Sequence, residues 1–101
     1  MDDEEWREIA DFMPPQVGKR HVDWRNICDA LIVRFNFRNC AWSKLPNASQ
    51  VRMAFMRAIE AGVWARIGAA LPMLKNVRQQ MWGNVLRGAE IAAIGRRERS
   101  K

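Results

Sequence analysis

The side chains in this sequence that could do chemistry are mostly cationic, and few of them could act as catalysts. The chain of 101 residues holds 17 Lys and Arg, a single histidine, His21, and two cysteines, Cys28 and Cys40. A zinc site would need a fuller set of ligands than these. The sequence contains no glycine-rich phosphate loop, serine-centred elbow or pair of carboxylates on one helix face. It therefore predicts neither an enzyme nor a bound cofactor.

The charges are divided unevenly along the chain. Residues 1–11 contain six carboxylates and one arginine, a net charge of −5. Because the whole chain carries +6, the remaining residues carry +11. Such a basic body is typical of proteins that bind nucleic acid, although any one arginine could equally be a solvated surface charge. The charge pattern thus favours double-stranded DNA as the partner.

Composition indicates a single folded domain. Hydrophobic residues make up 49% of the chain, with five Trp and four Phe, which is enough for one packed core. We expect Cys28 and Cys40 to be free thiols, with Cys28 a small core residue. No apolar run approaches the ~18 residues of a membrane span, and the acidic first residues are unlike a secretory signal. These features predict a cytoplasmic protein that does not contact a membrane.

Apolar residues recur at helical spacing through most of the chain, which predicts an all-α domain of about five helices. Carboxylates at residues 2–5 favour a helix start there, and Pro14 ends that helix. Asp23 can cap a second helix over about 24–38. Asn47 or Ser49 can cap a third helix that extends to residue 61, and a fourth spans 63–71. The expected core comprises Trp6, Ile27, Leu31, Phe35, Trp42, Leu45, Phe55, Ile59 and Trp64.

The second helix, a one-turn segment around Trp42 and the third helix form the outline of a helix-turn-helix. At ~100° per residue, the third helix directs Val51 and Phe55 to one face, together with Ala54, Ala58 and Ile59. The opposite face holds Gln50, Met53, Met56, Arg57 and Glu60, flanked by Arg52. From Met73 the pattern loosens, and residues 96–101 form a basic tail that we expect to be disordered. We therefore divide the chain into a helix-turn-helix domain, 1–74, and a helical extension, 75–101.

Several motifs resemble a known family. They are Met13-Pro14-Pro15, Cys40-Ala41-Trp42-Ser43-Lys44-Leu45-Pro46 and Glu60-Ala61-Gly62-Val63-Trp64. In this order and spacing they are similar to the amino-terminal domain of bacterial insertion-element transposases of the insertion-sequence-five type, over about residues 4–71. In that family the domain precedes a DDE catalytic domain. The resemblance implies a helical domain that binds the terminal repeats of the element.

The sequence departs from this family in two places. The family's helix before Glu60 is dense in Arg and Trp, whereas here it keeps Arg52 and Arg57 and has Met and Ala at other positions. Fewer phosphate contacts weaken binding and lower its salt dependence. Residues 85–93 resemble the family's stretch after the first catalytic aspartate, which places Trp82 where an acidic ligand for Mg²⁺ belongs. The resemblance thus implies a truncated transposase reading frame without a catalytic centre.

Two functions compete on these grounds. The first is a non-catalytic DNA-binding protein that acts in transcription regulation or on the insertion element. Its base contacts would be Gln50, Arg52, Met53 and Arg57, and its phosphate contacts would be Lys19, Arg20, His21, Arg25 and Lys44. The second is a protein-binding regulator, an inhibitor of a transposase or a transcription factor, that uses Met53 and Met56. Whether the partner is a further protein or a second copy stays open.

Overall fold

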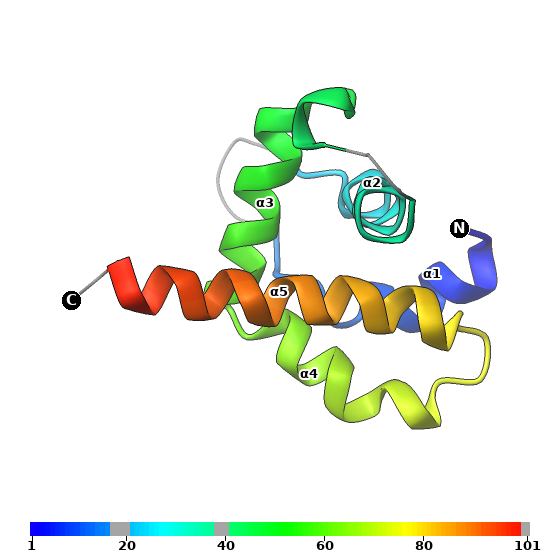
Figure 1. Ribbon diagram of the computed structural model, residues 1–101. Coiled ribbons are helices and arrows are strands. Elements are labelled where there is room, and N and C mark those ends of the chain that lie inside the picture. Colours follow the sequence, from blue (N-terminus) through cyan, green and yellow to red (C-terminus); the bar gives the residue numbers. More distant parts are fainter. Residues whose placement is uncertain (17–20, 38–40, 100–101) are drawn as a thin grey trace.

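The computed structural model describes residues 1–16, 21–37 and 41–99, with the backbone alone for 96–99. Within these ranges the chain forms five α-helices and no strand, so the predicted all-α class is confirmed (Figure 1). The α-helices are α1 (Asp3–Ala10), α2 (Trp24–Asn36), α3 (Ala48–Glu60), α4 (Val63–Ala70) and α5 (Gln79–Arg99). Two 3₁₀ turns, η1 (Trp42–Lys44) and η2 (Leu71–Met73), precede α3 and follow α4.

The helix starts follow from capping side chains. Asp2 accepts a hydrogen bond of 2.8 Å from the backbone N–H of Glu5 at the start of α1. Asp23 caps α2 as predicted, by accepting from the backbone N–H of Asn26. An aspartate at this position satisfies one of the four unpaired N–H groups of the first turn.

Helix α2 ends two residues earlier than the predicted residue 38, which itself lies outside the described ranges. Phe37 is already in an extended conformation. The Asn36 side chain donates to the backbone carbonyls of Ile32, at 2.8 Å, and of Met81, at 3.1 Å. Asn36 also accepts from the side chain of Asn84 at 2.8 Å. These bonds join the last turn of α2 to α5, a tertiary contact that the local sequence pattern does not reveal.

Helix α5 crosses the molecule and packs against both α2 and α4 (Figure 1). Trp82 and Val85 are completely buried, and Ala89 is nearly so. These three residues lie at positions i, i+3 and i+7, so they share one face of the helix. Residues after the fourth helix therefore belong to the same core cluster as the residues of α2 and α3.

Four aromatic rings, from α2, η1, α3 and α4, form the centre of the core, and we call them the aromatic cluster. Phe55 lies 5.5 Å from Phe35, 5.6 Å from Trp42 and 5.7 Å from Trp64, measured between ring centroids. Phe35 and Trp42 also meet edge to face at 5.8 Å. Tilted and edge-to-face arrangements are the favoured ones for aromatic pairs. The cluster therefore joins four separate elements around a single residue, Phe55.

The expected core is confirmed in outline. Of the nine residues predicted, Ile27, Leu31, Leu45, Phe55 and Trp64 are buried. The other four, Trp6, Phe35, Trp42 and Ile59, are partly buried and pack against the same cluster. Cys28 is buried and free, as expected, whereas Cys40 lies outside the described residues. Buried residues outside these nine include Ile9, Trp24, Ile32, Val63, Ile67, Val77, Trp82, Val85 and Ala89.

Helix α5 is longer and more regular than its three glycines suggest. A Cβ added at Gly83 or Gly95 would meet no atom within 4 Å, so at these two positions glycine costs only helix propensity. The helix continues to Arg99, although we expected 96–101 to be disordered. Once a helix is formed, each added residue gains a hydrogen bond without a new nucleation cost. Residues 100 and 101 lie outside the described ranges.

Gly88 is required for a different reason, since a Cβ there would overlap the ring of Phe35. We predict that Gly88→Ala lowers the free energy of unfolding by about 1–3 kcal/mol, the usual cost of overpacking a core. Gly83→Ala, on the same helix, should instead raise it by about 0.5–1 kcal/mol through helix propensity. Urea denaturation of the two variants checks this. Equal stabilisation by both substitutions would show that α5 does not approach Phe35 closely.

Candidate nucleic-acid interface

Helix α3 buries one face and exposes the other. Val51, Ala54, Phe55 and Ala58 are buried, which agrees with the face predicted from periodicity. We call the exposed side the outer face of α3. It comprises Ser49, Gln50, Arg52, Met53, Arg57 and Glu60. Met56 lies at its margin and is half-buried, whereas Met53 is 55% exposed. The structure thus brings together the four predicted base contacts on one helix.

The end of α3 explains the sequence Glu60-Ala61-Gly62-Val63-Trp64. Gly62 has a φ of 74°, in the left-handed region, so the chain can leave α3 and start α4 within two residues. Arg66 donates to the Ala61 carbonyl at 2.9 Å. Trp64 is buried and its indole N–H donates to the Phe55 carbonyl at 3.3 Å. The motif therefore ends one helix and anchors the next to the aromatic cluster.

The beginning of α3 is set by η1. Residues 37–47 separate α2 from α3, and η1 lies within them, directly before Leu45, which is buried. Asn47, one of the two capping residues that the sequence offered, precedes the helix with a φ of 54° and makes no side-chain capping bond. Lys44 is exposed on η1. The connection between α2 and α3 is thus longer than the three or four residues of a compact helix-turn-helix.

The remaining predicted phosphate contacts lie elsewhere. Arg25 is engaged with the start of the chain, where its guanidinium lies 2.7 Å from the Asp3 carboxylate and donates to the Met1 carbonyl at 2.9 Å. His21 is exposed and lines a shallow hollow of about 420 Å³ together with Arg25. This hollow lies at the junction of α1 and α2, away from α3. Lys19 and Arg20 lie outside the described residues.

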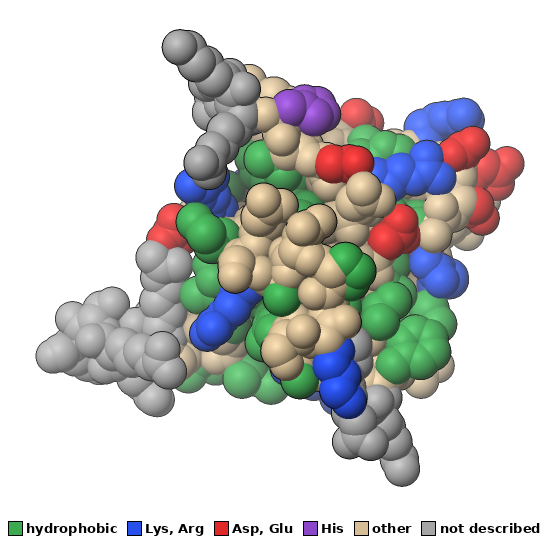
Figure 2. All heavy atoms as spheres, turned by 90° about the horizontal axis from the view of Figure 1, so that it is seen from above, with side chains coloured by type: hydrophobic (Ala, Val, Ile, Leu, Met, Phe, Trp, Pro, Cys, Tyr) green, Lys and Arg blue, Asp and Glu red, His purple; other side chains and the backbone are tan. Residues whose placement is uncertain are grey.

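The carboxylates of α1 hold the start of α5. The buried Glu5 accepts from Arg78 through the side chain, at 2.7 Å and 3.0 Å, and through the backbone N–H at 2.8 Å. Glu8 accepts the backbone N–H groups of Lys75 and Asn76. Anionic groups are favourable at a helix amino terminus. Figure 2 shows acidic side chains gathered toward the α1 side of the molecule. Part of the acidic segment therefore stabilises the fold by attaching α1 to the residues that lead into α5.

The ionisation of Glu5 reflects two opposing effects. Burial acts to raise the pKa of this carboxyl, but the hydrogen bonds and the charge of Arg78 outweigh burial and hold the pKa below its ordinary value. The same pair raises the pKa of Arg78. Glu5 is thus stabilised as an anion in the folded protein.

Other reactive groups in the described part of the chain are enclosed or scattered. Burial raises the pKa of the Cys28 thiol well above its ordinary range, so this thiol is a poor nucleophile. In the described ranges, no three His, Cys, Asp or Glu side chains lie close enough together to hold a metal ion. None of the helices there is long and apolar enough to cross a membrane.

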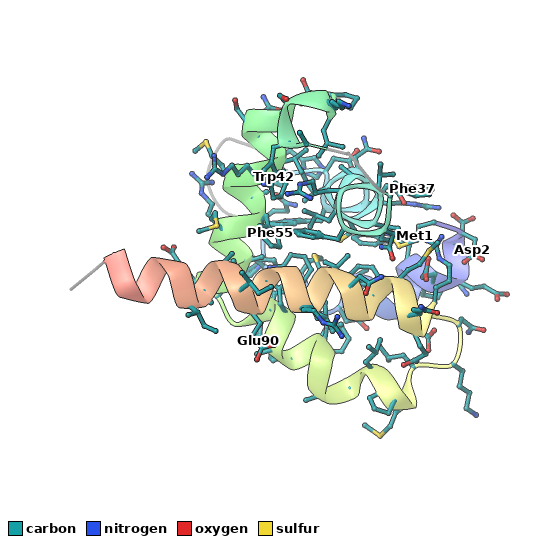
Figure 3. The ribbon with its side chains drawn as sticks, in the orientation of Figure 1. Met1, Asp2, Phe37, Trp42, Phe55 and Glu90 are labelled. Atoms are coloured by element: carbon teal, nitrogen blue, oxygen red, sulfur yellow. The ribbon has the colours of Figure 1, made fainter. Side chains whose placement is uncertain are left out.

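One residue that packs on the aromatic cluster escaped the sequence reasoning. Arg34 places its guanidinium carbon 5.1 Å from the ring centroid of Phe35 and 5.0 Å from that of Trp42. The view with side chains shows Trp42 and Phe55 between α2 and α3 (Figure 3). In the sequence, the one hint of these contacts is that Arg34 directly precedes the core residue Phe35. The contact with Trp42 could not be predicted, because Trp42 lies on a different element, η1.

The fold and the interface define a small all-helical domain that presents a partly basic helix face on an aromatic core. A family model described as "Putative transposase of IS4/5 family" (DUF4096) matches residues 1–68, and the chain belongs to this family. The match covers α1, α2, α3 and most of α4, and it stops before α5. No curated protein and no solved structure matches the chain.

We predict that Glu5→Gln lowers the free energy of unfolding at pH 7 by about 1–3 kcal/mol, the range for hydrogen bonds to charged groups. Because the folded-state pKa of Glu5 is lowered, its contribution is present above the ordinary carboxyl pKa and is lost as pH falls through the folded value. Urea denaturation of both proteins should therefore converge in acid. Glu4→Gln, at an exposed position on the same helix, is the control and should change stability by less than about 0.5 kcal/mol. A constant difference down to strongly acidic pH would contradict this account.

Proposed function

We propose that this chain is a non-catalytic DNA-binding protein in which the outer face of α3 enters a groove of duplex DNA. One observation carries the proposal. Gln50, Met53 and Arg57 are all exposed on a helix whose opposite face is fixed in the core. At ~100° per residue these three side chains lie within one strip of the helix surface. An α-helix fits the major groove of B-DNA and can present such a strip to base edges.

The side chains on this strip suit different base edges. The Arg57 guanidinium can donate two hydrogen bonds to guanine, and the Gln50 amide can bond adenine with both a donor and an acceptor. Met53 offers an apolar contact for the methyl group of thymine. Arg52 is exposed on the same helix, about 100° around from Met53. Lys44 on η1 lies shortly before the chain enters α3. The residues thus combine base contacts with neighbouring charges for phosphates.

Family membership and charge support the same proposal. Transposition acts on DNA, and the matched region includes the whole of α3. Residues after the acidic segment carry +11, which favours a polyanionic partner. We interpret α2, the connection that contains η1, and α3 as a helix-turn-helix with a lengthened turn, and α3 as its recognition helix. In this interpretation α2 braces the recognition helix through the aromatic cluster.

A second candidate, a protein-binding regulator, rests on the exposure of Met53. This side chain is 55% exposed, and flexible methionines suit the surfaces that bind partner helices. Met56, the other residue predicted for such a surface, is half-buried and packs against the core. The exposed apolar area on this helix is therefore small, and it is flanked by Arg57 and Gln50, which favours DNA.

We predict that Arg57→Ala costs about 1–3 kcal/mol of binding free energy on the preferred duplex and relaxes specificity at one base pair. Lys44→Ala should weaken binding to all duplexes alike and reduce the salt slope by about one unit, because it removes a phosphate contact. Arg7→Ala removes an equal charge from an exposed position on α1 and should change neither quantity. Binding titrations on preferred and scrambled duplexes at several salt concentrations provide the measurement.

The protein-binding alternative predicts a different pattern. Arg57→Ala would leave DNA affinity unchanged, and Met53→Glu would abolish association with a protein partner while the fold is kept. Under our proposal, Met53→Glu should weaken DNA binding, since it replaces the apolar contact with thymine by a carboxylate inside the groove of a polyanion.

We also predict that the protein shows no nuclease or strand-transfer activity with Mg²⁺ or Mn²⁺. Trp82, which aligns with an acidic ligand of the family in the resemblance above, is completely buried in the core. The measurement is cleavage of labelled duplex by purified protein, with Arg57→Ala as the matched preparation. A contaminating nuclease would cleave equally in both preparations. Cleavage by the wild-type protein that is lost in Arg57→Ala, purified in the same way, would contradict a non-catalytic role.

A further inference from the structure

Arg34 is a half-buried cation supported by aromatic rings rather than by a carboxylate. Its guanidinium lies about 5 Å from the ring centroids of both Phe35 and Trp42. Throughout the described ranges of the chain, no hydrogen bond or ion pair is formed by Arg34. Other arginines of α2 and the loop before α5 are neutralised, since Arg25 pairs with Asp3 and Arg78 with Glu5. Arg34 therefore differs from both in keeping its charge uncompensated.

The guanidinium of Arg34 is buried at its Nε and packs on two aromatic rings. Its Nε is buried and lacks a hydrogen-bond partner within the described residues. The residue as a whole is half-buried, and neither terminal nitrogen is among the buried atoms that lack a partner in the described residues. Cation–π contact stabilises the face of the guanidinium but leaves its in-plane N–H donors unused. These terminal donors form a fork that matches two oxygens of a phosphate group.

The position of this fork relates it to α3. Trp42 begins η1, which leads through residues 45–47 into α3, and the same ring contacts Phe55 in the middle of α3. Arg34 is thus held on the aromatic cluster that also fixes the outer face of α3. Because the guanidinium already packs on two rings, binding an anion there requires less loss of side-chain freedom than at a solvated arginine.

We propose that Arg34 binds a backbone phosphate of duplex DNA, end-on through Nη1 and Nη2, next to the strand that α3 contacts. This proposal rests on the DNA-binding function argued above. It adds a contact from α2, the helix that precedes the recognition helix, and such a contact fixes the register of α3 in the groove without reading sequence.

The test compares substitutions that change charge and geometry separately. Arg34→Gln should reduce the slope of log affinity against log salt by about 0.9, the value for one phosphate on B-DNA, equally on preferred and scrambled duplexes. Arg34→Lys should keep the slope and lose affinity several-fold, because lysine retains the charge but lacks the fork. Arg7→Gln, at an exposed position on α1, is the control for net charge and should leave the slope unchanged. Thermal unfolding of each variant shows that the compared proteins are folded.

An unchanged slope in folded Arg34→Gln would overturn the proposal, and so would an equal fall in Arg34→Gln and Arg7→Gln. If the wild-type protein fails to bind duplex DNA, the proposed function fails, and the Arg34 site is then tested alone.

In that case the ¹⁵N resonance of the Arg34 Nε–H is followed during titration with inorganic phosphate. A shift that is absent in a titration with sodium chloride supports an anion site at Arg34, and no shift overturns it. Equal, Arg34-dependent binding of an oligoglutamate peptide instead of duplex would overturn the assignment to phosphate.

Discussion

The burial of Phe55 is the contact on which the rest of this structure depends. The ring touches Phe35, Trp42 and Trp64, and so joins α2, η1 and α4 to α3. Because successive side chains on a helix are ~100° apart, burying Phe55 fixes the rotation of α3 about its axis. Gln50, Met53 and Arg57 must then point away from the core. The geometry of the candidate interface is thus a consequence of core packing and needs no special arrangement on the surface.

Residues beyond the matched family region complete this core. The match ends at residue 68, yet Trp82, Val85 and Ala89 of α5 are buried against the earlier helices. Gly88 lets the backbone of α5 approach Phe35, and the α1 carboxylates hold the start of the helix. The same arrangement separates charge, since part of the acidic segment is engaged at one side of the molecule while the outer face of α3 remains available to an anion.

Periodicity in the sequence was sufficient to predict the helices up to α4, the buried face of α3 and part of the core, because these depend on local spacing. It failed where a tertiary contact decides the outcome. From sequence alone, Gly88 only lowers the helix propensity of its segment. The structure shows that a larger residue there would overlap the ring of Phe35. In the sequence, Arg25 and Arg57 are both arginines within predicted helices and cannot be told apart. Only the fold shows that Arg25 forms an ion pair with Asp3. Arg34 could not be distinguished from a solvated arginine, because Trp42 comes from a separate segment.

The central claim is that α3, held by the aromatic cluster, is the surface that meets DNA. Its most direct test is a titration of ¹⁵N-labelled protein with a short duplex, followed by backbone amide resonances. We expect the largest shifts at Gln50, Met53, Arg57 and Lys44, with the amides of α1 unchanged. Shifts confined to α1 and the hollow beside His21, or none at saturating duplex, would contradict the account.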